Sequence, residues 1–171
     1  MQVSSQFLYR LGGGAALIGG LLRVISSFIP YHEEVAWLEG LYSFVDICLL
    51  FGLAAIYLKY AERLGGIGVI AFVLSTTGIA SIVGPDAIMF GINFYEAGAF
   101  TMITGLLFLS IQMLRNRVLL WASSLWILSF VFSVATILFS HSLLFIGAGI
   151  SFGVAYMLSG IELMKQQSLG S

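Results

Sequence analysis

Six long apolar segments alternate with short polar breaks along this chain. Each segment has roughly the 20 residues that a helix needs to cross the 30 Å hydrocarbon core of a bilayer. The breaks between them contain proline, glycine, histidine or charged residues, which are typical of turns. The pattern predicts an all-α polytopic membrane bundle that forms one transmembrane domain over residues 1–171, with helices at about 8–29, 37–58, 64–84, 93–114, 118–139 and 142–164.

The break at 140–142 is the weakest of the five, because it consists only of the tripeptide SHS. Without it, residues 118–164 would form one apolar helix about 70 Å long at 1.5 Å per residue. A bilayer core of about 30 Å cannot contain such a helix. A turn near His141 is therefore required.

The basic residues predict the orientation of the helices. The loops at 30–34, 84–86 and 140–142 contain no lysine or arginine, whereas bases occur at the N-terminus, in the other two loops and at the C-terminus: Arg10, Lys59, Arg63, Arg115, Arg117 and Lys165. Cytoplasmic loops carry this excess. We expect three antiparallel hairpins in a bacterial inner membrane, with both termini inside. The tetrapeptide RLGG occurs at 10–13 and again at 63–66, each time at the inner start of an outgoing helix.

The composition fits the same class of protein. Hydrophobic residues make up 60% of the chain and charged residues only 9%, with a mean hydropathy of +1.05. Values this far from those of soluble domains indicate that lipid surrounds most of the chain. We expect no nucleic-acid partner. Cys48 is the one cysteine, which excludes an intramolecular disulfide and a cysteine-rich metal site.

Small residues recur at a spacing of four in the first helix, at Gly12, Ala16 and Gly20, and Gly149 and Gly153 form a similar pair in the last helix. Such positions let the backbones of two helices approach closely. This helix-packing face contacts another helix either inside the bundle or on a partner protein. The sequence leaves both alternatives open.

Two ionisable residues lie within the apolar segments. Arg23 follows Arg10 by 13 residues, and Asp46 precedes Lys59 by 13 residues on the next helix. Both therefore lie about 20 Å above the inner boundary. A charge inside the membrane costs roughly 2.5–3.5 kcal/mol on insertion scales unless it is paired or hydrated. We predict an ion pair, which serves either as a clamp between helices or as a polar site for a solute or proton.

The remaining candidates for chemistry lie on the expected outer side. Acidic residues gather there, and with the two histidines they form the one candidate metal-binding set. The HEE tripeptide, however, lacks the i, i+4 spacing of a zinc motif. We expect no resident metal or cofactor. This outer acidic cluster and the histidines comprise Glu33, Glu34, Glu39, Asp86 and Glu96, with His32 and His141.

The chain resembles two kinds of membrane-protein family. The run from YRLGG to YLKYAERLGGIGVIAFVLS resembles hairpins of small uncharacterised bacterial multi-pass membrane families, which implies no activity. In size, helix number and the small residues of its first helix, the chain is also similar to the substrate-binding components of energy-coupling-factor transporters. That similarity implies that Gly12, Ala16 and Gly20 meet a transmembrane partner and that a ligand binds toward the outside.

Three classes of function follow from these features. The sequence favours a non-catalytic integral membrane subunit that packs against a larger partner or against itself in the bilayer. The alternative is a protein that binds or transports a small solute at a polar site in the outer half of the bundle. An enzyme has the least support, because the one serine-hydrolase-like motif, GISFG at 149–153, lies inside an apolar helix.

Overall fold

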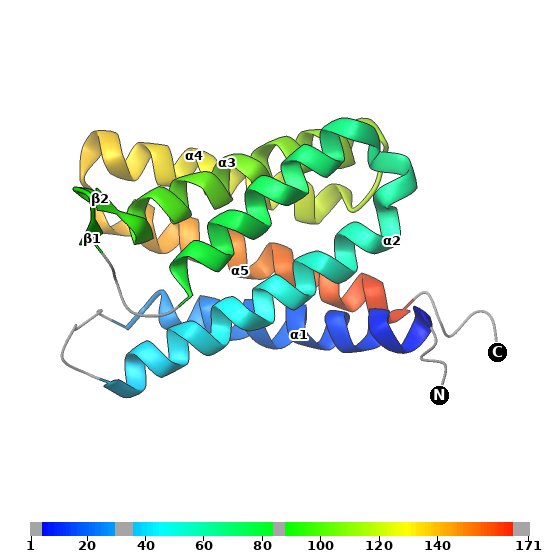
Figure 1. Cartoon of the computed structure of the whole chain (residues 1–171), viewed down its shortest axis with the longest axis horizontal. Helices are drawn as coiled ribbons and strands as arrows, with labels where there is room; N and C mark the ends of the chain where they lie inside the picture. The colour runs from blue at the N-terminus through cyan, green and yellow to red at the C-terminus, as the bar shows by residue number, and fades with distance from the viewer. Residues whose placement is uncertain (1–4, 30–35, 84–87, 166–171) are drawn as a thin grey trace.

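The computed structural model describes residues 5–29, 36–83 and 88–165 as an elongated bundle of helices. Figure 1 shows that α1 begins and α5 ends at the same end of the bundle. All five helices are long and apolar enough to cross a membrane, which confirms an all-helical, membrane-compatible fold. They are α1 (Ser5–Ser26), α2 (Ala36–Ile82), α3 (Phe94–Arg115), α4 (Leu120–Phe139) and α5 (Ser142–Lys165), with a hairpin of β1 (Ile88–Met89) and β2 (Ile92–Asn93) between α2 and α3.

The longest helix, α2, consists of two helical arms joined at Gly65. The φ of Gly65 is 61° and its ψ is −165°, outside the helical region. Glycine adopts a positive φ without the steric cost of a Cβ. In Figure 1 the second arm runs back from this point alongside the rest of the bundle.

The position of this break differs from the expected one. Residues 59–63, predicted as a loop, are helical, because they contain no glycine or proline and include good helix formers such as Lys59 and Glu62. The reversal falls instead in the second RLGG copy. The other helices lie within three residues of the predicted boundaries, and the turn between α4 and α5 occurs at Ser140 and His141 as expected.

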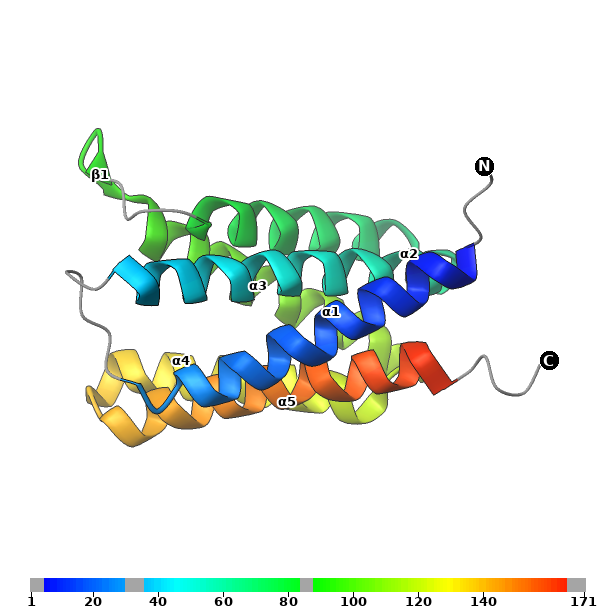
Figure 2. The same ribbon diagram turned by 90° about the horizontal axis from the view of Figure 1, so that it is seen from below.

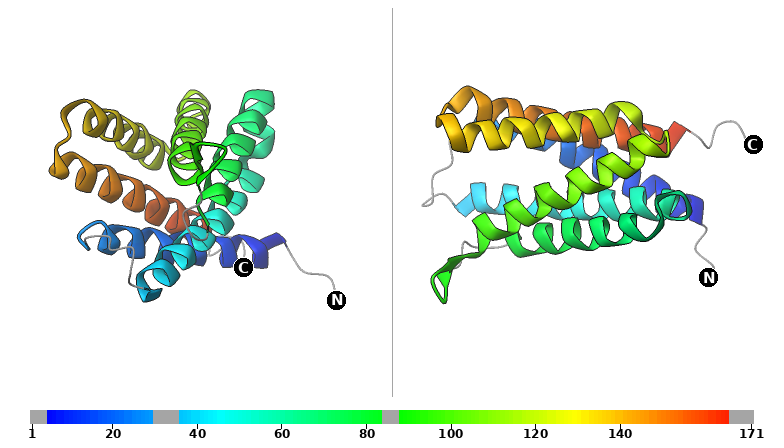
Figure 3. Two further views of the ribbon diagram at one scale, coloured as in Figure 1. Left: turned by 60° about the vertical axis from the view of Figure 1, so that its left-hand side comes forward. Right: turned by 90° about the horizontal axis from the view of Figure 1, so that it is seen from above.

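The helical segments form a ring in chain order. Each packs against its neighbours in the sequence, and α1 packs extensively against α5, which closes the ring. Figure 2 shows α1 lying between the first arm of α2 and α5, and Figure 3 shows the segments arranged around a common interior. The side chains inside this ring form the hydrophobic core.

Glycine lets α1 and α5 approach to backbone contact. A Cβ on Gly20 would lie 2.5 Å from the carbonyl oxygen of Gly153, and a Cβ on Gly153 would lie 2.5 Å from that of Gly20. One side of α1 therefore packs on α5. The other side packs on α2, where a Cβ on Gly52 would lie 2.8 Å from the Cβ of Ala16.

These contacts predict opposite effects for two alanine substitutions in the same helix. Gly20→Ala places a methyl group against the backbone of α5, so we expect a loss of about 1–3 kcal/mol of stability, the range typical of overpacking. Gly14→Ala is the matched control, since a Cβ there meets no atom within 4 Å. It should leave stability unchanged or raise it, because alanine favours the helix. Unfolding by SDS in mixed micelles measures both, and equal effects would contradict the packing described.

Candidate functional site

Asp46 lies inside the bundle on the first arm of α2. Only 9% of its surface is exposed. It follows the start of that helix by ten residues, or about 15 Å along the helix axis. A buried carboxylate within a long apolar helix is a strong pointer to function, because such residues are rare in membrane helices and face an interior partner or a pathway.

Arg23 lies half-buried in the last turn of α1, near Asp46. The Arg23 charge acts electrostatically on the Asp46 carboxyl group. Within the described part of the chain, however, no hydrogen bond joins the two side chains. The ion pair between Arg23 and Asp46 that the sequence predicts therefore stays a prediction. The Arg23 backbone carbonyl accepts hydrogen bonds from the hydroxyls of Ser26 (3.0 Å) and Ser27 (2.8 Å).

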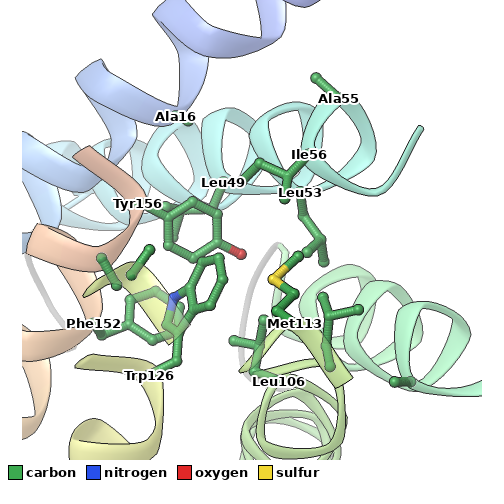
Figure 4. Packing of buried hydrophobic residues seen from close by; sticks show 14 of the residues in the cluster. Ala16, Leu49, Leu53, Ala55, Ile56, Leu106, Met113, Trp126, Phe152 and Tyr156 are labelled. Atoms are coloured by element: carbon green, nitrogen blue, oxygen red, sulfur yellow. The ribbon is translucent and has the colours of Figure 1, made fainter. Parts of the chain in front are cut away.

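Two aromatic residues that the sequence reasoning missed lie deeper in the same interior. Tyr156 of α5 is fully buried, and its ring meets the edge of Trp126 of α4 at a centroid distance of 5.2 Å and an interplanar angle of 75°. Phe152 lies on its other side at 5.1 Å. In Figure 4 the Tyr156 hydroxyl points into the middle of the bundle, toward the side where Leu53 and Met113 lie.

Within the described residues, five buried side-chain polar atoms lack a hydrogen-bond partner: Thr104 Oγ1, Ser110 Oγ, Ser123 Oγ, Trp126 Nε1 and Tyr156 OH. The serine and threonine hydroxyls can rotate to donate a hydrogen bond to a backbone carbonyl of their own helix, as Ser75 and Ser159 do. A phenol or an indole N–H ends too far from its own backbone for this. Tyr156 and Trp126 are therefore the two groups that need a partner from elsewhere.

The Asp46 carboxylate also acts electrostatically on the Tyr156 hydroxyl. Arg23, Asp46, Trp126 and Tyr156 thus bring two ionisable side chains and two unpartnered polar groups to the bundle from four helices. We call these four residues the interior polar site. Hydrogen bonds and charges in a region of low dielectric constant act more strongly than in water.

The predicted helix-packing face is used within the chain. Gly12 and Ala16 pack against α2, Gly20 packs against Gly153, and Gly149 packs against Ser27. All residues of this face are buried, so none is available on the surface of the bundle for contact with a partner protein.

The structure describes three of the predicted outer residues, Glu39, Glu96 and His141, and these three do not join the interior polar site. Glu39 and Glu96 are exposed, and the Glu96 backbone N–H donates to Asn93 Oδ1 (3.2 Å) as a helix cap. His141 is exposed in the turn before α5, where its Nδ1 accepts a hydrogen bond from the Leu143 N–H at 3.4 Å. The described residues contain no group of three histidine, cysteine, aspartate or glutamate side chains placed to hold a metal. His32, Glu33, Glu34 and Asp86 lie outside the described residues.

Comparison with known proteins adds no relative. No protein-family model, no curated protein and no solved structure matches the chain. The two resemblances drawn from the sequence stay expectations.

The missing partner of Tyr156 predicts the effect of removing its hydroxyl. Tyr156→Phe deletes an unsatisfied group, so we expect no loss of stability in the purified protein. Tyr42→Phe is the same chemical change at a hydroxyl that donates to the Ser26 carbonyl oxygen at 3.3 Å, between α2 and α1. It should cost about 0.5–1.5 kcal/mol. SDS unfolding of both variants checks this, and a loss in Tyr156→Phe as large as that in Tyr42→Phe would show that the Tyr156 hydroxyl has a partner in the folded chain.

Proposed function

We propose that this chain is a six-span integral membrane protein of three helical hairpins, with both termini in the cytoplasm, that binds a small polar solute at the interior polar site as part of its transport. The lengths of the helices support six spans. A straight α2 of 47 residues would be about 70 Å long, more than twice the bilayer core. The reversal at Gly65 gives two arms, each long enough to be one span.

One observation carries the proposed binding function. The Tyr156 hydroxyl and the Trp126 indole N–H are both buried without a partner near an intramembrane carboxylate. Each unsatisfied polar group costs about 1–3 kcal/mol on the scale of protein mutational data. A bundle that serves only as packing gains nothing from this arrangement. A protein that binds a solute recovers the cost when the solute supplies the missing hydrogen bonds.

The geometry gives less support to a non-catalytic subunit of a larger complex, the function that the sequence favoured. That hypothesis rested on the short loops, the absence of catalytic motifs and the small residues of α1, and these small residues contact α2 and α5 of the same chain. The same holds for the similarity to energy-coupling-factor components, which implies that these residues meet a partner. A complex would have to use a different surface.

The six-span arrangement predicts which residues a membrane-impermeant thiol reagent reaches. In a Cys48→Ser background, a cysteine replacing Gly66, where a Cβ has open space, should react only from the cytoplasmic side. A cysteine replacing Phe90, which is 95% exposed at the tip of the β1–β2 hairpin, should react only from the outside. Labelling of intact cells and inverted vesicles distinguishes the two sides. Labelling of both positions from the same side would exclude the proposed topology.

Trp126 provides a built-in reporter for solute binding. It is 2% exposed, whereas Trp37 and Trp121 are 63% and 81% exposed, so replacing these two by phenylalanine leaves one tryptophan, at the site. We expect the fluorescence of this variant to change when the low-molecular-mass fraction of a cell extract is added.

Two further variants decide whether the response comes from the interior polar site. Asp46→Asn should abolish it at normal protein abundance, and Glu96→Gln, the same kind of change at an exposed carboxylate, should preserve it. A subunit predicts the opposite: Asp46→Asn lowers abundance, and no extract fraction changes the fluorescence. That result would overturn the proposed function.

A further inference from the structure

An open pocket lies at the end of the bundle where α2 reverses direction. Its volume is about 400 Å³, within the range of small-molecule sites. Two glycines leave this space open, since a Cβ on Gly65 or Gly66 would meet no atom within 4 Å. The wall includes residues from the end of α3 and from the reversal of α2: Gln112, Arg115 and Asn116, with Gly65, Gly66 and Ile67. None of them belongs to the interior polar site.

The polar side chains of this pocket offer hydrogen-bond donors. Arg115 is exposed, and within the described residues its guanidinium forms no ion pair or hydrogen bond with another residue. The Asn116 side-chain amide donates one N–H to the Gln112 backbone carbonyl oxygen at 2.8 Å and keeps a second N–H. The Gln112 side chain adds another amide, and no carboxylate lines the pocket. The pocket therefore offers a positive charge and several donors to an anion, without a negative charge in its wall.

The sequence around the pocket is basic as well. Arg63 lies just before the lining residues of α2, and Arg117 just after those of α3. Glu62 is the nearest acid in the sequence, and it is exposed and outside the wall. Among anions, phosphate matches an arginine especially well, because the planar guanidinium can donate to two phosphate oxygens at once.

The pocket lies at the depth of lipid headgroups. Figure 1 shows the reversal of α2 at the end of the bundle where α1 begins and α5 ends. A bilayer changes from hydrocarbon to headgroups where its apolar helices begin and end.

One helical turn further from this end, the same two segments expose apolar side chains to the bilayer. Ile70 follows Ile67 by three residues and is 63% exposed. Phe108 precedes Gln112 by four residues and is 46% exposed. Residues at these spacings share one face of a helix. A ligand with both a phosphate group and acyl chains fits this arrangement better than a soluble phosphate does.

We propose that this pocket binds the phosphate group of an anionic phospholipid, with Arg115 at the phosphate oxygens and the acyl chains along Ile70 and Phe108. Basic pockets between transmembrane helices bind lipid headgroups of this kind. A zwitterionic lipid also has a phosphate, but its ammonium group finds no carboxylate in the wall. Under the proposed topology the lipid belongs to the cytoplasmic leaflet, although the binding itself requires only that the helices span a membrane.

Native mass spectrometry counts the lipids that stay bound when the purified protein is released from mixed micelles. Equal amounts of phosphatidylglycerol and phosphatidylcholine are the probes, because both have a phosphodiester but differ in net charge. We expect the protein to retain phosphatidylglycerol in preference to phosphatidylcholine. Arg115→Gln should weaken phosphatidylglycerol binding about fivefold, the effect of one basic residue near an anionic lipid. Arg117→Gln removes the same charge from an exposed side chain outside the pocket wall and should leave binding unchanged.

A second pair of variants tests the pocket without changing a charge. Gly66→Leu places a side chain in the open space of the pocket, so it should weaken phosphatidylglycerol binding as much as Arg115→Gln does. Gly14→Leu is the matched control at an open position of α1 and should have no effect. Far-UV circular dichroism checks that both variants fold. If Gly66→Leu does not fold, the comparison of Arg115→Gln with Arg117→Gln decides, since both side chains are exposed.

Three results would overturn this inference. Equal retention of the two lipids would show that the pocket does not select a negative headgroup. An equal loss in Arg115→Gln and Arg117→Gln would show that the overall charge at this end of the bundle attracts the lipid. Displacement of phosphatidylglycerol by inorganic phosphate or glycerol 3-phosphate would assign the pocket to a soluble phosphate compound instead of a lipid.

Discussion

The contact between the first and last helices is the interaction on which the rest of the bundle depends. Other neighbouring helical segments are joined by short connections in the chain, but α1 and α5 meet only by folding. Gly20 and Gly153 bring their two backbones together where any Cβ would collide with a carbonyl oxygen. This contact closes the ring, and it brings α1 with Arg23 and α5 with Tyr156 to the same interior as Asp46.

A closed ring of helices changes the energetics of every polar group inside it. In an interior of low dielectric constant, a satisfied group is stabilised more strongly than in solution and an unsatisfied one costs more. Most of the buried hydroxyls meet this constraint by bonding within their own helix or to a neighbour, as Ser129 does with the Ala148 carbonyl oxygen at 2.9 Å. Of the five groups without a partner among the described residues, Trp126 and Tyr156 cannot turn to a carbonyl of their own helix, and their rings are in contact. Their clustering, more than any one of them, gives the interior its proposed binding role.

The hydrophobic pattern predicted the helices well, because the length and spacing of apolar segments depend on the bilayer and not on tertiary contacts. It misplaced one break: it predicts a loop at residues 59–63, whereas the reversal occurs at Gly65, which has the conformational freedom that a positive φ requires. The two RLGG copies also differ. In the first copy, Gly12 and Gly13 lie within α1 and contact neighbouring helices, whereas in the second copy Gly65 forms the turn. Sequence alone could not identify Trp126 and Tyr156, because an aromatic residue in an apolar segment cannot be distinguished from an ordinary residue of the hydrophobic core. Their missing hydrogen bonds are visible only in the three-dimensional structure. The β1–β2 hairpin was missed for a related reason, as Phe90 adopts a positive φ of 55° that sequence preference does not favour.

The central claim is that the Trp126 indole N–H has no partner in the folded chain and receives one from a bound solute. Solution NMR of protein labelled with ¹⁵N-tryptophan observes this group directly, and a Trp126→Phe variant assigns its signal. We predict that the low-molecular-mass fraction of a cell extract shifts the Trp126 indole proton downfield, as expected for a new hydrogen bond, while the signals of Trp37 and Trp121 stay in place. A Trp126 signal that already shows a strong hydrogen bond without added solute, and that the extract fraction leaves unchanged, would contradict the account.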